Sequence, residues 1–589
     1  MQSLFLWRPR AAVHGADEPE SRTSGFGASV EQLMWAASLF WALAANRLFF
    51  GAALKDRLLT EPATWTFALA LLVMLTALHY LLLSLVCTRY SVKPVLAVLL
   101  VGTALATHFM QSYGVYLDPS MMRNVLRTDV AEARELFSWT LLPHLLLYAV
   151  LPLMLLWRVR VRPRRWTRAV GLRLATMGAA LAVLVGTLML VFQPFASMMR
   201  NHKEMRYLAT PANYMWSIGA VAAAQAKGAA KPREPIGLDA APGPDFRARS
   251  KPLVVVLVVG ETARAANWGL NGYARQTTPE LAALSARNGQ PGAGTLLNFT
   301  DVTACGTNTE VSLPCMFAPV GRRDYDESSV RGRESLLHVA ARAGVAVHWR
   351  DNQSGCKGVC EGLPQDEVSS LKLPGLCQDG RCLDEGLLAG LDERLAALAR
   401  PAGPAHRAPE APAPTQLLVL HTLGNHGPSY FRRYPPAFAR FQPTCNFDDL
   451  QKCSREEIVN AYDNALLYTD HVLVSLVAKL QAASASVDSA VLYVSDHGES
   501  LGESNLFLHG LPYAIAPDLQ KRVPMTLWFS PGTTAALRLD TACLGRRTAQ
   551  PFAHDHLFHT LLGLLDVKTA LYEPPFDLAQ GCRSSEAMH

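Results

Sequence analysis

Five long runs of apolar residues stand out in the first 200 positions of the chain. They lie at roughly 32–53, 66–88, 93–111, 140–157 and 174–197. Each run is close to the about 20 residues that a helix needs to cross a bilayer. Asn46 and Arg47 interrupt the first run, which makes it the least regular of the five. The pattern predicts an N-terminal α-helical transmembrane domain of five helices over residues 1–197.

The basic residues between the runs predict how the helices are oriented. The loop at 158–173 carries seven arginines and no acid, and the turn at 89–93 carries Arg89 and Lys93. Cytoplasmic loops are enriched in lysine and arginine, so we expect both connections in the cytoplasm. Alternation then places the N-terminus inside and everything after the fifth helix outside the cytoplasm.

A polar connection leads from the fifth run to the C-terminal half. Residues 198–226 mix Met, Tyr and Trp with Arg and Lys, which is typical of a helix at the bilayer surface. A helix packed on a soluble domain fits equally well. A linker rich in Pro, Ala and Gly runs from about 228 to 251. We expect an interfacial helix and linker over 198–250 and a soluble domain over 251–589, with the Pro/Ala-rich segment 400–414 as an exposed loop.

Four short runs rich in Val and Leu mark the soluble half. They are LVVVLVVG (253–260), VAVHW (345–349), QLLVLH (416–421) and AVLYVS (490–495). Near-continuous apolar runs of this length are typical of strands buried on both faces of a parallel sheet. Helical segments alternate with them, so the fold class predicted for this half is α/β.

Three of these strands lead into residues that can bind a metal. Glu261 follows the first strand, His421 ends the third shortly before His426, and Asp496 and His497 follow the fourth. Ligands of open α/β sheets collect beyond the carboxyl ends of the strands, so we expect these side chains to converge. Carboxylates mixed with imidazoles favour zinc over magnesium or calcium, which prefer oxygen ligands, although manganese also fits.

The segment Cys305-Gly-Thr-Asn-Thr309 comes just before an apolar run and is typical of a loop entering a helix. Backbone N–H groups at a helix start bind phosphate well. A threonine beside a metal can be activated as a nucleophile toward phosphorus. The alternative is that Thr307 and Thr309 only cap the helix.

Ten of the 11 cysteines lie after residue 300, and their even number in close pairs indicates disulfides formed in an oxidising compartment. Pairing of neighbours, which we assume, gives 305–315, 356–360, 377–382, 445–453 and 543–582. A cytosolic zinc–thiolate site is less favoured, because the pairs lack repeated Cys-x-x-Cys spacing. The formal net charge of +6 comes without a basic stripe in this half, which argues against nucleic-acid binding.

Several motifs together resemble one enzyme family. They are YGVYLDPSMMRNVLRTDVAEA (113–133), VVGETARAANWGLNGYARQTTP (258–279), CGTNTEVSLPCMF (305–317), WRDNQSGCKGVC (349–360), HTLGNHGPSYFRRYP (421–435) and SDHGESLGESNLFLHG (495–510). They are similar to those of the phosphoethanolamine transferases of Gram-negative inner membranes, which include lipid A modifying enzymes that confer polymyxin resistance. The resemblance implies a multi-pass protein with a periplasmic catalytic domain of the alkaline phosphatase/sulfatase type.

The resemblance also implies a metal centre. Glu261, Thr309, Asp496 and His497 match the primary zinc ligands, and Thr309 matches the nucleophile that becomes phosphorylated. One departure lies beside it, since Glu310 stands where the family more often has Ala. We therefore expect one zinc ion at these four residues and an unusual charge next to the nucleophile.

Further positions match residues that hold the substrate in the family. His426 and His509 match residues beside the donor phosphate, where a second zinc ion is possible. Lys357 matches a substrate-binding lysine. Ser354 and Gln353 fall near the expected ethanolamine headgroup, although the family often has Asn where Gln353 stands.

The implied reaction moves phosphoethanolamine from phosphatidylethanolamine to a lipid A phosphate through a covalent phospho-threonine intermediate, in a monomer bound to the bilayer. A core sugar of lipopolysaccharide or another glycan is an alternative acceptor, and phosphoglycerol an alternative group. A membrane-bound phosphatase or sulfatase is a second class, although the Thr309 region lacks the Cys/Ser-x-Pro-x-Arg motif of sulfatases. A non-catalytic membrane scaffold is a third.

Overall fold

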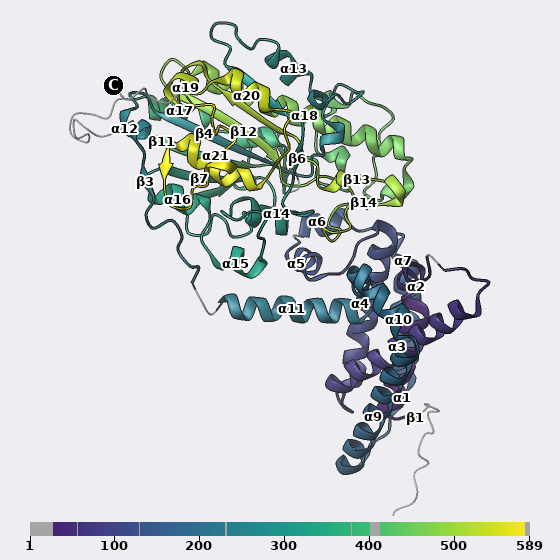
Figure 1. Ribbon diagram of the computed structural model, residues 1–589. Coiled ribbons are helices and arrows are strands. Elements are labelled where there is room, and N and C mark those ends of the chain that lie inside the picture. The colour runs from purple at the N-terminus through teal and green to yellow at the C-terminus, as the bar shows by residue number, and fades with distance from the viewer. Residues whose placement is uncertain are drawn as a thin grey trace, which may run out of the picture.

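The structure is a computed structural model that describes residues 27–55, 57–128, 130–229, 232–378, 380–400 and 413–583. Most of the segment predicted as an exposed loop at 400–414 lies outside the described residues. Figure 1 shows a bundle of helices and an α/β domain, with helix α11 (Ala212–Ala229) running between them. The two-part organisation therefore follows the division between apolar runs and strand-rich segments.

Four helical segments in the described residues are long and apolar enough to cross a membrane unbroken. They are α3 (Pro62–Val86), α4 (Val92–Tyr113), the segment Leu141–Arg158 and α9 (Trp166–Leu190). The first apolar run instead forms a bent pair, Val30–Ala45 and Arg47–Leu54, with an angle of 58° between them. The bundle thus has four spans, or five if the bent pair counts as one, in agreement with the five helices expected.

Asn46 explains the bend in the first run. Its buried side chain donates to the backbone carbonyls of Trp41 (2.9 Å) and Thr210 (2.7 Å), and accepts from the N–H of Thr210 (2.9 Å). Backbone groups freed by a break inside a membrane must find partners within the protein. Asn46, the polar residue that interrupts the apolar pattern, therefore provides hydrogen bonds to backbone groups at the break.

The limits predicted for the fifth span need correction. The run at 174–197 was expected as one helix, but α9 begins at Trp166 and ends at Leu190, and α10 (Phe192–Asn201) follows. The helix starts earlier because backbone hydrogen bonding continues through the polar, arginine-bearing turn that hydropathy excludes. It ends earlier near Pro194, which has no N–H to donate to the helix.

The segment expected at the bilayer surface consists of the end of α10, a 3-10 turn (Lys203–Leu208) and α11. The start of α11 packs on the membrane helices, where the hydroxyl of Tyr214 donates to the carbonyl of Leu99 (2.8 Å). Trp216 on the same helix is 69% exposed. The start of α11 therefore packs on the membrane helices, and a position at the bilayer surface stays a prediction.

A seven-stranded sheet forms the centre of the α/β domain. Its order is β5 (Thr295–Phe299), β15 (Met525–Phe529), β12 (Asp488–Ser495), β4 (Leu253–Gly260), β11 (Thr415–His421), β7 (Ala346–Asp351) and β8 (Gln365–Glu367). The pairs from β12 to β8 are parallel, and β15 is antiparallel to both of its neighbours. The α/β class with a parallel core is confirmed. One strand, β7, extends two residues beyond the predicted end.

Helices cover both faces of this sheet. Val255, Leu257 and Val259 of β4 pack into one core with α16 (Leu336–Arg342) and α21 (Asp555–Leu565). The alternate residues of β4 pack into a second core with α13 (Pro279–Ser285) and α18 (Arg455–Ala482). Burial on both faces explains why the strand reads as a continuous apolar run.

Five disulfides brace the α/β domain, and the assumed neighbour pairing is confirmed. The bonds are Cys305–Cys315, Cys356–Cys360, Cys377–Cys382, Cys445–Cys453 and Cys543–Cys582. Cys87, buried among the membrane helices, is the one free cysteine in the described part of the chain. With its ten cysteines in disulfides, the domain offers no thiolate cluster to a metal.

A loop of the membrane part lies against the α/β domain. It carries α5 (Pro119–Arg127) and α6 (Val130–Glu135), which Figure 1 places between the bundle and the sheet. Arg127 of α5 forms an ion pair with Glu310, whose side chain is fully buried and also bonds Arg331 (3.1 Å). The unusual acid beside Thr309 thus joins the two parts of the protein.

The Glu310→Gln substitution should loosen this junction. An uncharged amide cannot balance Arg127, and hydrogen bonds to charged groups contribute about 1.5 kcal/mol or more. We expect the backbone amides of α5 to exchange hydrogen roughly tenfold faster in the full-length variant, measured by mass spectrometry. Glu334→Gln is the matched control, because Glu334 pairs with Arg342 (2.6 Å) inside the α/β domain. Equal exchange of α5 in both variants would contradict the prediction.

Candidate active site

Adjacent parallel strands bring three predicted ligands together. Glu261 directly follows β4, and Asp496 and His497 directly follow β12, whose carboxyl end pairs with that of β4. One ligand atom from each of the three residues lies within 4.8 Å of the others, and all three are fully buried. The convergence predicted from the strand ends is therefore present in the structure.

Thr309 points into this group. Its hydroxyl lies 3.1 and 3.3 Å from the two carboxylate oxygens of Glu261 and 3.4 Å from Nε2 of His497. The residue opens α14 (Thr309–Met316), but Asn308 caps that helix by accepting from the N–H of Val311 (3.0 Å). The hydroxyl of Thr309 is thus not used as a cap, which removes the structural alternative for this residue.

Thr307 has a different surrounding. Its hydroxyl donates to the carbonyl of Leu511 (2.6 Å), and its own carbonyl accepts from the N–H of Gly510 (2.7 Å). These bonds tie the loop before α14 to the segment that carries His509. Of the two threonines in the motif, only Thr309 contacts the metal-ligand group in the described structure.

The backbone around Glu261 is constrained. Thr262 has a φ of 61°, which is uncommon for a β-branched residue, and its N–H and hydroxyl bond Asp496 (3.1 Å) and Glu261 (2.6 Å). Gly424 has a φ of +50°, and a Cβ there would lie 2.7 Å from the carbonyl of Glu261. Strained backbone held by its surroundings is frequent at functional sites.

The electrostatics of the group favour a cation. Burial lowers the pKa of His497, but Asp496 and Glu261 raise it more strongly, to about 10. Burial and the charge of Glu261 raise the pKa of Asp496 to about 7. Two buried carboxylates therefore share the one positive charge that His497 can supply.

The donor atoms fit a zinc ion. His497 donates from Nδ1 to the carbonyl of Gly498 (2.9 Å), which turns Nε2 toward Glu261 and Asp496, each 3.4 Å away. Oδ2 of Asp496 is buried and has no hydrogen-bond partner among the described residues. Two carboxylates, an imidazole nitrogen with its partner bond in place and the hydroxyl of Thr309 suit tetrahedral zinc.

His426 and His509 line the same site. The rings of His497 and His509 have centroids 4.3 Å apart, and those of His426 and His509 are 5.8 Å apart. Burial lowers the pKa of both His426 and His509 to about 3, so both rings are neutral and can accept a proton or a metal. Nδ1 of His509 lies 3.4 Å from Glu499, and Nε2 of His426 lies 3.7 Å from Glu132. Glu132 belongs to α6, so the membrane part contributes to the wall of the site.

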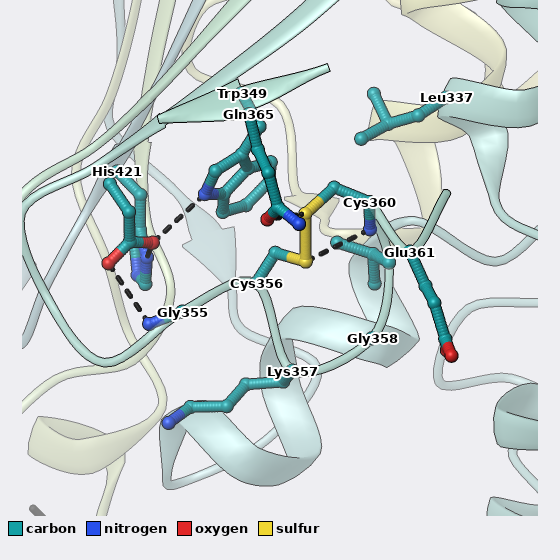
Figure 2. Close-up of a disulfide and its surroundings, with 12 residues drawn as sticks. Leu337, Trp349, Gly355, Cys356, Lys357, Gly358, Cys360, Glu361, Gln365 and His421 are labelled. Atoms are coloured by element: carbon teal, nitrogen blue, oxygen red, sulfur yellow. Dashed lines mark hydrogen bonds and ion pairs between the residues drawn. A yellow bond between two sulfur atoms is a disulfide. The ribbon is translucent and has the colours of Figure 1, made fainter. Parts of the chain in front are cut away.

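The loop after β7 carries Gln353, Ser354 and Lys357. The disulfide Cys356–Cys360 closes the turn that contains Lys357 (Figure 2). Nζ of Lys357 donates to the carbonyl of Ser354 (3.1 Å), and the hydroxyl of Ser354 donates to Gln353. In the described structure these three residues bond to one another and to Asp351 rather than to Thr309. The three residues lie in a neighbouring loop and form no hydrogen bond with the ligand group in the described structure.

Sequence reasoning missed the role of two strand-end residues. His421 was expected as a candidate metal ligand, but its bond to Asp351 was not foreseen, and Asp351 ends β7 beyond the predicted limit. Nδ1 of His421 lies 2.9 Å from Asp351, and Nε2 lies 3.9 Å from Glu261. The strand-end rule that identifies Glu261 also applies to Asp351. The apolar pattern, however, ends that strand at Trp349, two residues too early.

Comparisons with known proteins identify both parts of the chain. The family model Phosphoethanolamine transferase EptA/EptB matches residues 34–226, and the Sulfatase model matches residues 254–567. The phosphoethanolamine transferase EptA of Salmonella typhimurium is 37% identical over 82% of this chain and 84% of its own length. The phosphatidylethanolamine transferase Mcr-1 of Escherichia coli is 36% identical over 91% of this chain and 94% of its own length.

A solved structure agrees over the whole length. The integral membrane lipooligosaccharide phosphoethanolamine transferase A (EptA) from Neisseria meningitidis superposes with a TM-score of 0.85 at 36% identity, covering 95% of this chain and all of that one. The agreement includes the membrane bundle as well as the α/β domain. This protein belongs to the family of phosphoethanolamine transferases.

Proposed function

We propose that this protein transfers phosphoethanolamine from phosphatidylethanolamine to a phosphate of lipid A, with Thr309 as the nucleophile. The observation that carries the proposal is the hydroxyl of Thr309, which lies 3.1 Å from Glu261 inside a buried group of metal donors. The printed names of the relatives support the reaction type, and the name of Mcr-1 supports the donor. The lipid A acceptor is inferred from the same sequence similarity.

In the first step, the oxygen of Thr309 attacks the phosphorus of the donor. The hydroxyl donates its hydrogen bond toward the carboxylate of Glu261, which orients the oxygen lone pairs into the site. A zinc ion held by Glu261, Asp496, His497 and Thr309 would favour the alkoxide and reduce the negative charge on the phosphoryl group. The proton of Thr309 passes to the carboxylate of Glu261, the bond from phosphorus to the diacylglycerol oxygen breaks, and phosphoethanolamine stays on Thr309.

His426 or His509 would donate a proton to the leaving diacylglycerol oxygen. Burial keeps both imidazoles neutral, but the negative charge of a phosphodiester beside them raises the pKa of an imidazole. Protonation of either ring would then accompany donor binding, and the ring would pass that proton to the departing alkoxide. A second zinc ion held by the same two rings is the other use of this pair.

In the second step, a phosphate oxygen of lipid A attacks the phosphorus on Thr309, and the released threonine oxygen takes its proton back from Glu261. Both substrates are lipids, so a site walled by Glu132 of the membrane part lies within reach of them. We place the protein in the bacterial inner membrane as a monomer, with the α/β domain in the periplasm. The five disulfides and the arginine-rich loop at 158–173 support that placement.

The Thr309→Ala substitution should abolish the covalent intermediate and the transfer. Without the hydroxyl there is no atom to form the bond to phosphorus, so we expect a loss of at least about 10³-fold in kcat, in line with the removal of a covalent nucleophile. Mass spectrometry of the full-length protein incubated with phosphatidylethanolamine measures the adduct. Thr307→Ala is the matched control, since its hydroxyl bonds Leu511 and not the ligand group. An adduct that persists in the Thr309 variant would remove it as the nucleophile.

Metal removal should stop the reaction reversibly. We expect the purified protein to hold at least one zinc ion, because two buried carboxylates need a compensating charge. Chelation should abolish transfer, and added zinc should restore it. The Asp496→Ala and Glu261→Ala variants should lose zinc, as measured by elemental analysis. Full activity of a metal-free preparation would exclude a metal mechanism.

The acceptor can be tested in cells. Expression in a susceptible Gram-negative host should add phosphoethanolamine to lipid A and raise polymyxin tolerance, because an added ammonium group lowers the attraction to cationic peptides. Mass spectrometry of lipid A measures the addition, and Thr309→Ala serves as the inactive control. If a core sugar or another glycan gains the group while lipid A does not, the acceptor is wrong and the transferase activity stands.

A further inference from the structure

Asp351 is a buried acid whose two carboxylate oxygens are both fully used. Oδ1 accepts from the backbone N–H groups of Gln353 (2.8 Å) and Gly355 (3.0 Å). Oδ2 accepts from Nε1 of Trp349 (2.9 Å) and from Nδ1 of His421 (2.9 Å). The side chain thus accepts four hydrogen bonds from three segments of the chain, which are β7, the loop after it and the end of β11.

One side of this carboxylate orders the loop that carries the predicted substrate residues. The bonds to Gln353 and Gly355 fold the chain just after β7, and the disulfide Cys356–Cys360 closes the turn that follows. In Figure 2 the dashed lines from Trp349 and Gly355 meet on this carboxylate, while Lys357 extends away from the disulfide. The position of Lys357 therefore depends on a loop anchored at Asp351.

The other side of the carboxylate faces the metal-ligand group through His421. Because Nδ1 of His421 bonds Asp351, the ring is oriented with Nε2 toward Oε2 of Glu261, 3.9 Å away. Nε2 of His421 is buried and has no hydrogen-bond partner among the described residues. The ring therefore packs between the anchored loop and the carboxylate that contacts Thr309.

We propose that Asp351 is a positioning residue that couples the loop of Ser354 and Lys357 to Glu261 through His421. This inference rests on the proposed transferase function. One carboxylate holds both the loop predicted to bind the headgroup and the ring beside the ligand of the nucleophile. The phosphorus of the donor and the oxygen of Thr309 are thereby held in a common geometry.

The Asp351→Asn substitution tests this coupling, because an amide offers one acceptor oxygen where the carboxylate offers two. The amide cannot accept from both the loop and His421, so one side must meet a donor instead. We expect the KM for phosphatidylethanolamine to rise and kcat to fall, each by roughly threefold or more, in the full-length enzyme. The amides of Gln353 and Gly355 should also exchange hydrogen faster, which is a readout independent of activity.

Asp366→Asn is the matched control. Asp366 pairs with His348 (3.1 Å) and Arg350, whose side chains alternate along β7 with those of Trp349 and Asp351 and so lie on the other face of the sheet. Asp366 and His348 thus form an acid–histidine pair at the same sheet edge, but this pair does not bond Glu261 in the described structure. Equal KM, kcat and exchange in the Asp351→Asn and Asp366→Asn enzymes would overturn the proposal.

A double variant separates coupling from two independent defects. His421→Gln should lower kcat, and in the Asp351→Asn background it should add little further loss, because both changes break the same link. Multiplied losses would overturn the proposal. If Asp351→Asn does not fold, His421→Gln alone decides: faster exchange at Gln353 and Gly355 supports the coupling, and unchanged exchange refutes it. Normal transfer by Thr309→Ala would instead refute the proposed function itself.

Discussion

The burial of acidic side chains at one edge of the sheet is the constraint on which the rest of this structure depends. Glu261 and Asp496 are fully buried at the ends of two adjacent strands. An ionised carboxylate taken from water costs several kcal/mol unless a positive charge compensates it. His497 supplies one positive charge beside them, and the zinc ion proposed above would supply the rest of the compensation next to the hydroxyl of Thr309. The same burial would limit the access of water to the proposed phosphoryl transfer.

The membrane part is a structural component of this site as well as its anchor. Glu132 of α6 approaches His426, and Arg127 of α5 pairs with the buried Glu310 beside Thr309. Arg433, close to His426 in sequence, pairs with Glu135 of α6. The proposed lipid substrates would therefore meet a site whose walls come from both parts of the chain. The contact also explains how Glu310 is tolerated next to Thr309, since its charge is balanced by arginines.

Much of the fold follows from local patterns. The strands at 253–260, 416–421 and 490–495 were predicted from continuous apolar runs, because strands covered by helices on both faces need no polar positions. The apolar runs also located the membrane helices, but hydropathy placed the ends of α9 wrongly. Helix ends depend on backbone hydrogen bonding and on residues such as Pro194, which an average over apolar residues does not register.

By itself the sequence determined the α/β class and the convergence of Glu261, Asp496 and His497, because parallel strands place their carboxyl ends at one edge. The even number of cysteines indicated disulfides, but their pairing was an assumption that the structure confirmed. Only the tertiary structure decided which further side chains complete the arrangement. The four bonds of Asp351, the partner of Glu310 and the approach of α6 to the site join residues far apart in the chain. Such contacts depend on how helices and loops pack in three dimensions, and no period or spacing along the sequence encodes their direction.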